Sequence, residues 1–287
     1  MTLKVLLQKL FIGGKWYVGY RDIKLTNGRK YHIVDVPIGQ WIADPFMYEY
    51  GGMHYLFVEQ YFEDKGRAGI GFFQFENGVP TNNQVIIEND YHMSYPCVFN
   101  HKGKHYIIPE SSANNTIDLY VAESFPSSWS HKATLLQGEK YVDSTVYQNG
   151  DEVYLLSYKK EDSIWKLVLF GLDVEECKLN KITEVVFTKN TGRPAGFLYF
   201  DKKLYRPAQD CSRKYGEALI INEVDKICSN GYKEHSVSKI LCSDIKCSEN
   251  IQRIHTLNND SQYEVVDLFQ EKFDLLHTWK ILKRAYL

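Results

Sequence analysis

Short runs of residues that alternate between apolar and polar side chains recur along most of the chain. Residues 116–124 (TIDLYVAES) and 165–173 (WKLVLFGLD) are examples, and turns built on Gly, or on Asp and Lys, separate many of these runs. A period of two places successive side chains on opposite faces of a strand. The pattern therefore predicts an all-β fold made of consecutive hairpins.

Four hairpins are similar enough to be aligned as internal repeats, and a fifth, weaker copy follows them. Each has an apolar strand, a turn and a second strand with a Tyr at a matching position. The repeats are ADPFMYEYGGMHYLFVEQ (43–60), SYPCVFNHKGKHYIIPES (94–111), VDSTVYQNGDEVYLLSYK (142–159), GRPAGFLYFDKKLYRPAQ (192–209) and IQRIHTLNNDSQYEVVDLF (251–269). The matching tyrosines are Tyr55, Tyr106, Tyr154, Tyr205 and Tyr263.

The spacing of the first four repeats is 48 to 51 residues, a period that suits one four-stranded propeller blade. Five copies predict a five-bladed β-propeller over residues 1–268. The segment KWYVGYRDI (15–23) precedes the first repeat. We expect it to add an outer strand to the last blade and so close the ring, which removes exposed strand edges.

The pattern changes near residue 268, which predicts a different structure for the tail. Over residues 269–287 the apolar residues Leu275, Trp279, Leu282 and Tyr286 recur every three or four positions beside Lys and Arg. This spacing is typical of an amphipathic helix. Two interpretations stay open: a helix packed on the flank of the propeller, and a basic, aromatic helix that touches an anionic membrane.

The starts of the repeats are important because the first strand of each propeller blade lines the central channel. Eleven residues before the matching tyrosines are Asp44, Tyr95, Asp143 and Pro194, and fifteen residues further on a second equivalent set includes Glu59, Glu110 and Gln209. Several carboxylates in one concave site are suited to glycosyl chemistry, and crowding raises their pKa values. Asp44, Asp143 and Glu110 are therefore candidate catalytic residues, unless each Asp only caps a turn.

Further candidates for substrate binding come from the fourth and fifth repeats. The fourth contributes Arg193, Arg206, Gln209, Asp210 and Tyr215. Guanidinium groups suit phosphate or carboxylate recognition, although a pair of Arg206 with Asp210 inside the blade is an equal alternative. His255 enters from the fifth repeat as a ligand contact or as a hydrogen-bonded structural group. The first and second repeats add Trp41, Glu59 and Tyr95.

Composition limits the classes of partner. The 287-residue chain has a net charge of −2 with acidic and basic residues interspersed, so we expect no nucleic-acid partner. No stretch approaches the roughly 18 apolar residues of a membrane-spanning helix, and no secretory signal is recognised at the N-terminus. Six scattered cysteines favour reduced thiols over a zinc site. These features predict a cytoplasmic protein, with peripheral membrane contact if the tail helix binds a bilayer.

Five separated motifs resemble a known family. WIADPF, SYPCVF with IPES, VDSTVY, LYRPAQDCSRKYG and IHTLN occur in the same order in the N-terminal domain of plant glucosamine inositolphosphorylceramide transferases, a domain also found in bacteria. The resemblance runs from about Trp16 to Asp267. It implies a fold similar to the five-bladed propellers of glycoside hydrolase family 43, the arabinanase and xylosidase type.

The resemblance carries only two of the three catalytic acids of those hydrolases to this chain. Asp44 in ADPF matches their general base, and Asp143 in VDST matches the Asp that modulates a pKa and orients the substrate. Their general acid, a Glu at the start of blade four, has no counterpart, because residues 193–196 read RPAG. Without that acid an inverting hydrolase cannot readily protonate a sugar leaving group.

An activated donor removes the need for the missing acid, because a phosphate leaves without a proton and a cation stabilises its charge. We therefore expect glycosyl transfer from a sugar-phosphate donor in the synthesis of a cell-surface polysaccharide or glycolipid. Asp44 would act as base, Asp143 would orient it, and Arg193 and Arg206 would bind the phosphate. Two alternatives stay open: a furanosidase or xylosidase with Glu110 as acid, and a non-catalytic sugar-binding module. No cofactor is required, and a divalent cation on the channel axis stays open.

Overall fold

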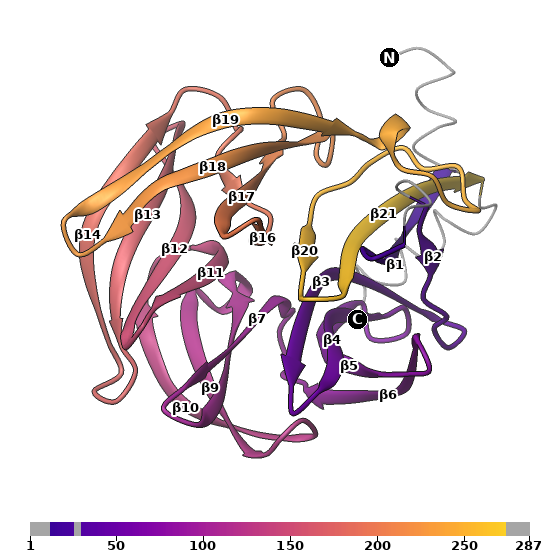
Figure 1. Ribbon diagram of the computed structural model, residues 1–287, viewed down its shortest axis with the longest axis horizontal. Helices are drawn as coiled ribbons and strands as arrows, with labels where there is room; N and C mark the ends of the chain where they lie inside the picture. The colour runs from indigo at the N-terminus through magenta and orange to yellow at the C-terminus, as the bar shows by residue number, and fades with distance from the viewer. Residues whose placement is uncertain (1–11, 26–29, 274–287) are drawn as a thin grey trace.

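Five β-sheets surround one axis in the computed structural model, which describes residues 12–25 and 30–273 (Figure 1). Each sheet is a meander of antiparallel strands, and blade four carries one short additional strand. The innermost strands contact their neighbours around a closed circle. This arrangement confirms the five-bladed β-propeller that the repeats predict.

The blades follow one another along the chain, except that the N-terminal segment completes the last one. Blade one contains β3 (Gln40–Tyr50), β4 (Met53–Phe62), β5 (Arg67–Glu76) and β6 (Val79–Ile87). Blade two contains β7 (Ser94–His101), β8 (Lys104–Ser111), β9 (Thr116–Ser124) and β10 (Ser128–Gln137), with a 3-10 turn η1 (Ser112–Asn114). Blade three contains β11 (Val142–Asn149), β12 (Glu152–Glu161), β13 (Ile164–Asp173) and β14 (Lys178–Phe187).

The last two blades are less regular at the axis. Blade four contains β15 (Arg193–Pro194), β16 (Leu198–Phe200), β17 (Lys203–Asp210), β18 (Ala218–Cys228) and β19 (Gly231–Leu241), followed by a 3-10 turn η2 (Cys242–Asp244). Blade five contains β20 (Leu257–Asn259), β21 (Tyr263–Phe273), β1 (Ile12–Asp22) and β2 (His32–Ile33). The two short strands β15 and β16 both pair with β17, so the inner strand of blade four is interrupted between them.

The ring closes by pairing of the first and last described strands. β1 runs antiparallel to β21 from Ile12 opposite Phe273 to Asp22 opposite Tyr263. The predicted closing segment is therefore confirmed, but it is the third strand of its blade, because β2 forms the outer edge. Pairing of the first and last described strands in one sheet removes two edges that would otherwise be exposed.

The boundary predicted between propeller and tail is wrong by five residues. β21 continues to Phe273, so residues 269–273 are strand and not the start of a helix. The remainder of the predicted amphipathic helix, residues 274–287, and with it the proposed membrane contact, falls outside the described part of the chain. Within residues 12–25 and 30–273, no helix has the length and apolar character needed to cross a bilayer.

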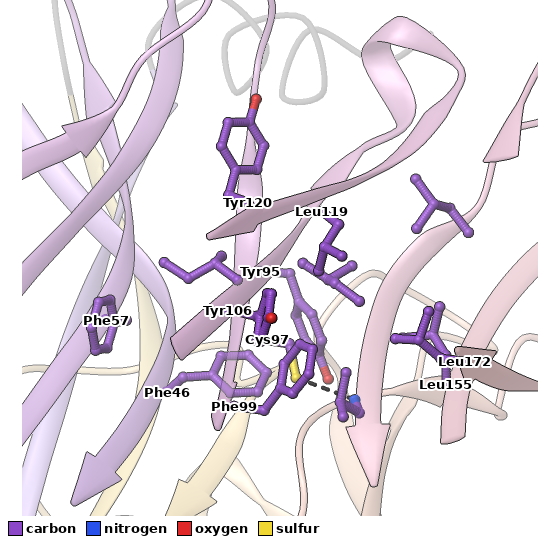
Figure 2. Close-up of a cluster of buried hydrophobic side chains, with 14 of the residues drawn as sticks. Phe46, Phe57, Tyr95, Cys97, Phe99, Tyr106, Leu119, Tyr120, Leu155 and Leu172 are labelled. Atoms are coloured by element: carbon purple, nitrogen blue, oxygen red, sulfur yellow. Dashed lines mark hydrogen bonds between the residues drawn. The ribbon is translucent and has the colours of Figure 1, made fainter. Parts of the chain in front are cut away.

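The hydrophobic core lies in layers between neighbouring blades. The largest layer joins blades one, two and three, and three further layers join the remaining neighbours around the ring. Figure 2 shows part of the largest layer, where Phe46, Tyr95 and Phe99 cluster beside Cys97, whose sulfur accepts a hydrogen bond from the N–H of Val146 (3.2 Å). Each blade is thus apolar on both faces, because it packs on a neighbour on each side.

The inner strands of blades one, two and three share a backbone irregularity at the same repeat position. Asp44, Tyr95 and Asp143 have φ values of 47°, 47° and 51°, and the pairing register shifts at each of them. A bulge with a left-handed residue interrupts the ladder and redirects a side chain, at a local energetic cost. Such bulges recur beside functional sites, and here they are repeated with the blades.

A belt of contacts joins the innermost strands across the axis. The Tyr95 hydroxyl is hydrogen-bonded to Thr145 Oγ1 (2.8 Å) and accepts the N–H of Gly196 (2.7 Å). Asn258 accepts the N–H of Phe197 (3.1 Å) and donates to the carbonyl of Pro45 (2.7 Å). We call Pro45, Tyr95, Thr145, Gly196 and Asn258 the axial belt; it contains one residue from each blade.

Gly196 offers a direct test of the belt. Its φ is 105°, and an added Cβ would lie 2.4 Å from Asn258 Oδ1 and 2.5 Å from the Leu257 carbonyl oxygen. Backbone strain and overpacking should together destabilise Gly196→Ala by about 3–5 kcal/mol in urea unfolding. The control is Gly150→Ala, with φ 61° and no atom within 4 Å of the added Cβ, where about 1 kcal/mol is expected. Equal losses in the two variants would contradict a tightly packed belt.

Arg206 is part of the internal structure of blade four, which corrects its assignment to phosphate binding. Its side chain is fully buried, and Nε donates to Glu234 Oε2 (2.8 Å) and to the Tyr232 hydroxyl (3.0 Å). Nη1 donates to the carbonyl of Gly192 (3.1 Å). Arg206 and Gln209 are three residues apart on β17. Side chains alternate along a strand, so these two point to opposite faces.

Removal of this buried guanidinium should be costly. Arg206→Met leaves Glu234 without its charge partner, and we expect a loss of about 3–5 kcal/mol in urea unfolding. Arg213→Met is the matched control, because Arg213 forms an Arg–Glu pair with Glu217 in the same blade but is 83% exposed. Exposed pairs contribute little, so this variant should unfold like the parent. A stable Arg206→Met protein would reopen the phosphate-binding assignment.

Candidate functional site

Charged side chains converge where the innermost strands begin, on one side of the axial belt. We call this region the acidic end; its residues are Asp44, Glu59, Glu110, Asp143, Arg193, His255 and Asp267. The sequence placed six of these seven at the axis, and the structure brings them together. They form two clusters, one around Asp44 and one around Asp143.

The first cluster joins Asp44 of blade one to blade five. Asp44 Oδ1 accepts a hydrogen bond from Thr256 Oγ1 (2.7 Å) and lies 3.6 Å from His255 Nε2. The other ring nitrogen, Nδ1, contacts Asp267 Oδ2. Asp267 also accepts the N–H groups of His255 and Thr256 (2.9 Å each) and the N–H of Asp44 (3.2 Å). The imidazole is therefore held between two carboxylates in one orientation.

Burial and mutual charge set the protonation of this cluster. Burial raises the pKa of Asp44 to about 8, against the lowering effect of His255, and the charges of Glu59, Asp267 and Asp143 contribute to the rise. Burial alone would lower the pKa of His255, but Asp267 and Asp44 raise it to about 9. A carboxyl that titrates near neutral pH exchanges protons readily with a hydroxyl. Asp44 is therefore suited to act as an acid or a base.

The same three side chains carry the ligand types of a divalent cation. One ligand atom from each of Asp44, His255 and Asp267 lies within 4.8 Å of the others. Asp267 and Asp44 raise the pKa of His255, so its imidazole holds a proton near neutral pH. A metal would have to displace that proton, because only neutral imidazole coordinates a metal. The imidazolium thus supplies the positive charge of this cluster near neutral pH.

The second cluster joins blades two, three and four around Asp143. Arg193 makes a two-pronged contact: Nε meets Asp143 Oδ2, and Nη2 donates to Oδ1 (3.1 Å) and reaches Glu110 Oε2 (3.5 Å). Gln209 Nε2 also donates to Asp143 Oδ2 (2.9 Å). Glu110 accepts the N–H of Asp143 on Oε2 (3.2 Å) and the Ser112 hydroxyl on Oε1 (2.7 Å).

This arrangement holds Asp143 in a fixed position. Burial raises the pKa of Asp143 to about 7, Arg193 opposes the rise, and Glu110 adds to it. Burial would lower the pKa of Arg193, but Asp143 and Glu110 hold it well above its ordinary value. Two of the three guanidinium nitrogens are occupied by these acids, and among the described residues Nη1 has no hydrogen-bond partner. Nη1 is thus the atom through which Arg193 is free to contact a ligand.

Glu59 pairs with a histidine that the sequence analysis did not single out. His92 Nε2 lies 3.3 Å from Glu59 Oε1, and His92 Nδ1 accepts the N–H of Ala68 (3.2 Å). Burial alone would lower the pKa of His92, but Glu59, with Glu110 and Asp44, raises it. Because its side chain is 40% exposed, His92 is accessible to a ligand at the rim of the acidic end.

Aromatic rings flank both clusters. Trp16 stacks on His255 with ring centroids 4.1 Å apart, and Tyr215 meets the same imidazole edge-on at 5.1 Å. The Arg193 guanidinium lies 5.6 Å from the centre of the Tyr215 ring. On the side of blade one, Trp41 stacks on Tyr61 at 4.3 Å. Trp41 and Tyr215 are both partly accessible, so their predicted contact with a substrate stays open.

Two predicted binding residues do not face a ligand at the acidic end. Tyr95 is fully buried, and its hydroxyl is committed to the axial belt, so we correct its assignment to substrate contact. Asp210 accepts hydrogen bonds from Lys239 Nζ (2.6 Å) and from the N–H of Ser212 (3.1 Å), on the strand face opposite Gln209. The alternative, a pair of Arg206 with Asp210, is also not formed, since each has another partner within blade four.

Three members of the site were missed, and only one of them had a signal in the repeats. Asp267 lies fifteen residues beyond Gln252, the fifth-repeat position that matches Asp44, so the same offset that identified Glu59 and Glu110 leads to it. Trp16 reaches the site through the pairing of β1 with β21. His92 precedes β7 outside the aligned segments, so the repeats could not identify it.

Known proteins match this chain in sequence over most of its length. The family model described as "Glucosamine inositolphosphorylceramide transferase 1, N-terminal" matches residues 34–266. A relative from Arabidopsis thaliana, Glucosamine inositolphosphorylceramide transferase 1, is 28% identical over 211 residues. The match covers 69% of this chain but 27% of the relative. The chain thus corresponds to about a quarter of the length of that protein.

Solved structures show the same fold at low sequence identity. A family 117 glycoside hydrolase from the marine bacterium Zobellia galactanivorans superposes with a TM-score of 0.57 at 13% identity, covering 93% of this chain and 92% of that one. Bacteroides ovatus Xyloglucan PUL GH43B gives a TM-score of 0.54 at 17% identity, covering 79% and 48%. These likenesses establish the architecture, while the family match covers most of the chain. The protein belongs to the glucosamine inositolphosphorylceramide transferase 1 N-terminal family.

Proposed function

We propose that the acidic end binds a sugar or sugar phosphate and takes part in glycosyl transfer, with Asp44 as the base that activates an acceptor hydroxyl. One observation carries the proposal. Asp44 titrates near pH 8 beside a fixed imidazole, while blade four supplies Arg193 where a hydrolase of the related fold would supply a carboxylic acid. The site therefore has a base for an acceptor and a cation for an anionic leaving group, but no carboxylic acid at the start of blade four.

The transfer step balances with the groups present. The ionised Asp44 carboxylate takes the proton of the acceptor hydroxyl, and the oxygen of that hydroxyl bonds to the anomeric carbon of the donor sugar. The bond from that carbon to the phosphate oxygen breaks, and the phosphate leaves with the electron pair. His255, held by Asp267, keeps Asp44 oriented, and Nη1 of Arg193 faces the leaving group. Asp143, fixed by Gln209 and Arg193, orients the substrate.

The names of the relatives suggest the chemical class of the substrates. The relative from Arabidopsis thaliana is named as a glucosamine transferase that acts on inositolphosphorylceramide. By analogy we propose an amino sugar as the transferred group and an inositol phosphate headgroup as the acceptor, in the synthesis of a cell-surface glycolipid. Activated sugar donors are cytosolic, so the proposal places the reaction at the cytoplasmic side of a membrane.

A sugar-binding module without catalysis is the second candidate. Two observations favour it over hydrolysis. The chain matches only 27% of the Arabidopsis relative, so another part of such a protein has room for the chemistry. In addition, both oxygens of Glu110 accept hydrogen bonds, from Ser112 on one side and from Arg193 and the Asp143 N–H on the other. An ionised carboxylate fits that arrangement better than the proton donor that a hydrolase requires.

The pH dependence of transfer tests Asp44 as the base. We expect release of UDP from UDP-N-acetylglucosamine or UDP-glucosamine, with inositolphosphorylceramide in detergent as acceptor, to rise with pH through about 8 as Asp44 ionises. Asp44→Asn should lower the rate at least about 100-fold, the usual scale of general-base catalysis. Asp151→Asn, in an exposed turn of blade three, is the matched control and should keep the parental rate.

Other outcomes support the alternatives. Cleavage of aryl arabinofuranosides or xylosides that is lost in Asp44→Asn, without release of UDP from the donors, would favour the hydrolase with Glu110 as acid and Asp44 as base. Absence of turnover with all these substrates, together with sugar binding that survives Asp44→Asn, would favour the binding module.

The raised pKa of Asp44 can be tested without a substrate. A carboxyl whose pKa rises from 3.8 to about 8 on folding holds its proton more tightly in the folded state, so stability falls as pH rises through that range. Asn cannot ionise, so Asp44→Asn should lose less stability than the parent between about pH 5 and about pH 9 in urea unfolding. The Asp151→Asn control should follow the parent. Parallel pH profiles for the parent and Asp44→Asn would refute a raised pKa at Asp44.

A further inference from the structure

A cavity lies on the other side of the axial belt from the acidic end, at the far ends of the innermost strands. Its volume is about 390 Å³, and every blade contributes to its lining, with Glu49, Asn100, Gln148, Tyr199 and Asn259 as the outermost contributors. The volume falls within the range of about 300–1,000 Å³ that is typical of small-molecule sites. We call this cavity the distal cavity.

The axial belt separates the distal cavity from the acidic end. Thr145 and Asn258 belong both to the belt and to the lining of the cavity. Behind them the Tyr95 side chain is fully buried and bonded to blades three and four. A ligand in the distal cavity would therefore not touch the groups that carry the proposed transfer chemistry.

An exposed aromatic side chain lines the distal cavity. Among the described residues, only Tyr50, Tyr199, Phe200 and Tyr215 are exposed aromatics. Tyr199 is 55% exposed and lines the cavity, Phe200 follows it directly, and Tyr50 follows the lining residue Glu49. Side chains alternate along a strand, so Tyr50 and Phe200 point to the opposite strand faces from Glu49 and Tyr199, and Tyr50 packs against His105 and Phe125. Among the described residues, Tyr199 is thus the exposed aromatic that lines the cavity.

The polar groups of the cavity have hydrogen-bonding capacity left for a ligand. In the described part of the chain, the hydroxyls of Tyr147 and Tyr199 have no protein partner. Gln148 Nε2 donates to the carbonyl of Asn100 (2.6 Å). Its Oε1 has no hydrogen-bond partner among the described residues. Among the described residues, the lining contains no Lys, Arg or His, and Glu49 adds a carboxylate. A phosphate or a uronic acid would find no counter-charge, so the lining favours an uncharged polar ligand.

The aromatic rim is held in position before any ligand binds. The N–H of Tyr199 donates to Asn259 Oδ1 (3.0 Å), and Asn259 Nδ2 donates to the Tyr199 carbonyl (3.1 Å). The N–H of Phe197 is likewise bound by Asn258. These bonds tie β16 to blade five and fix the backbone that carries Tyr199 and Phe197. A rim that is already ordered loses little entropy on binding.

We propose that the distal cavity binds a short neutral saccharide. A sugar ring has one face of C–H groups, which packs on an aromatic ring, and an edge of hydroxyls, which needs uncharged donors and acceptors. Tyr199 and Tyr147 provide the rings, and Gln148 with the two tyrosine hydroxyls provides the polar partners. The combination of aromatic rings with uncharged polar groups matches this ligand class better than a lipid tail, which needs no hydrogen bonds, or a nucleotide, which needs cations.

Saturation-transfer NMR with defined disaccharides tests the proposal. The probes are cellobiose, maltose, lactose and N,N′-diacetylchitobiose at millimolar concentration, with glucuronic acid as the charged comparison. At least one neutral disaccharide should bind, and Tyr199→Ala should weaken that binding at least about tenfold, a loss typical of one removed contact. Any signal from glucuronic acid should be unchanged in Tyr199→Ala, because the distal cavity offers it no counter-charge. Tyr199 is exposed, so its variant should melt like the parent in circular dichroism.

Tyr50→Ala is the matched control, because Tyr50 is a similarly exposed tyrosine that packs against His105 and Phe125 and does not line the cavity. It should leave disaccharide binding unchanged. Three results would overturn the proposal: no signal from any neutral disaccharide, full affinity in Tyr199→Ala, or an equal loss in both variants. Because the belt separates the two ends, each of these results leaves the transfer assay with Asp44→Asn unaffected, and failure of that assay leaves this test intact.

Discussion

Hydrogen bonds between the innermost strands are the constraint on which the rest of this molecule depends. Neighbouring blades pack through apolar layers, which supply stability but do not dictate how the strands meet at the axis. There the Tyr95 hydroxyl links blades two, three and four, and Asn258 links blades four, five and one. Buried polar groups are costly unless paired, so this belt is satisfied in essentially one arrangement.

The carboxylates of the acidic end have a structural task at the axis. The bulges at Asp44 and Asp143 release backbone N–H groups from the strand ladder, and Asp267 and Glu110 of the preceding blades accept them. His255 and Arg193 then balance the charge that these acids bring into the interior. Strand placement and pKa values are thus set by the same contacts, since a carboxylate that ties two blades together also raises the pKa of its buried neighbour.

Fold and chemistry separate clearly in this protein. Its architecture is shared with glycoside hydrolases at 13–17% identity, which establishes the propeller but not an activity. At the start of blade four, however, Arg193 binds Asp143 and Glu110, so a cation lies among the acids at the axis. The belt separates these charges from the distal cavity, where Glu49 is the charged residue among the described lining residues.

The sequence alone determined the fold and most of the acidic end, because blade repeats force equivalent positions to meet at one axis. Asp44, Asp143 and Glu110 followed from that periodicity, and Asp267 was within its reach. Tertiary structure decided the rest: Arg206 faces Glu234 because strand alternation turns it from the axis, and Tyr95 became a belt residue because its partners lie in other blades. Periodicity specifies where a residue lies along a blade, whereas bulges and contacts between blades specify what its side chain touches.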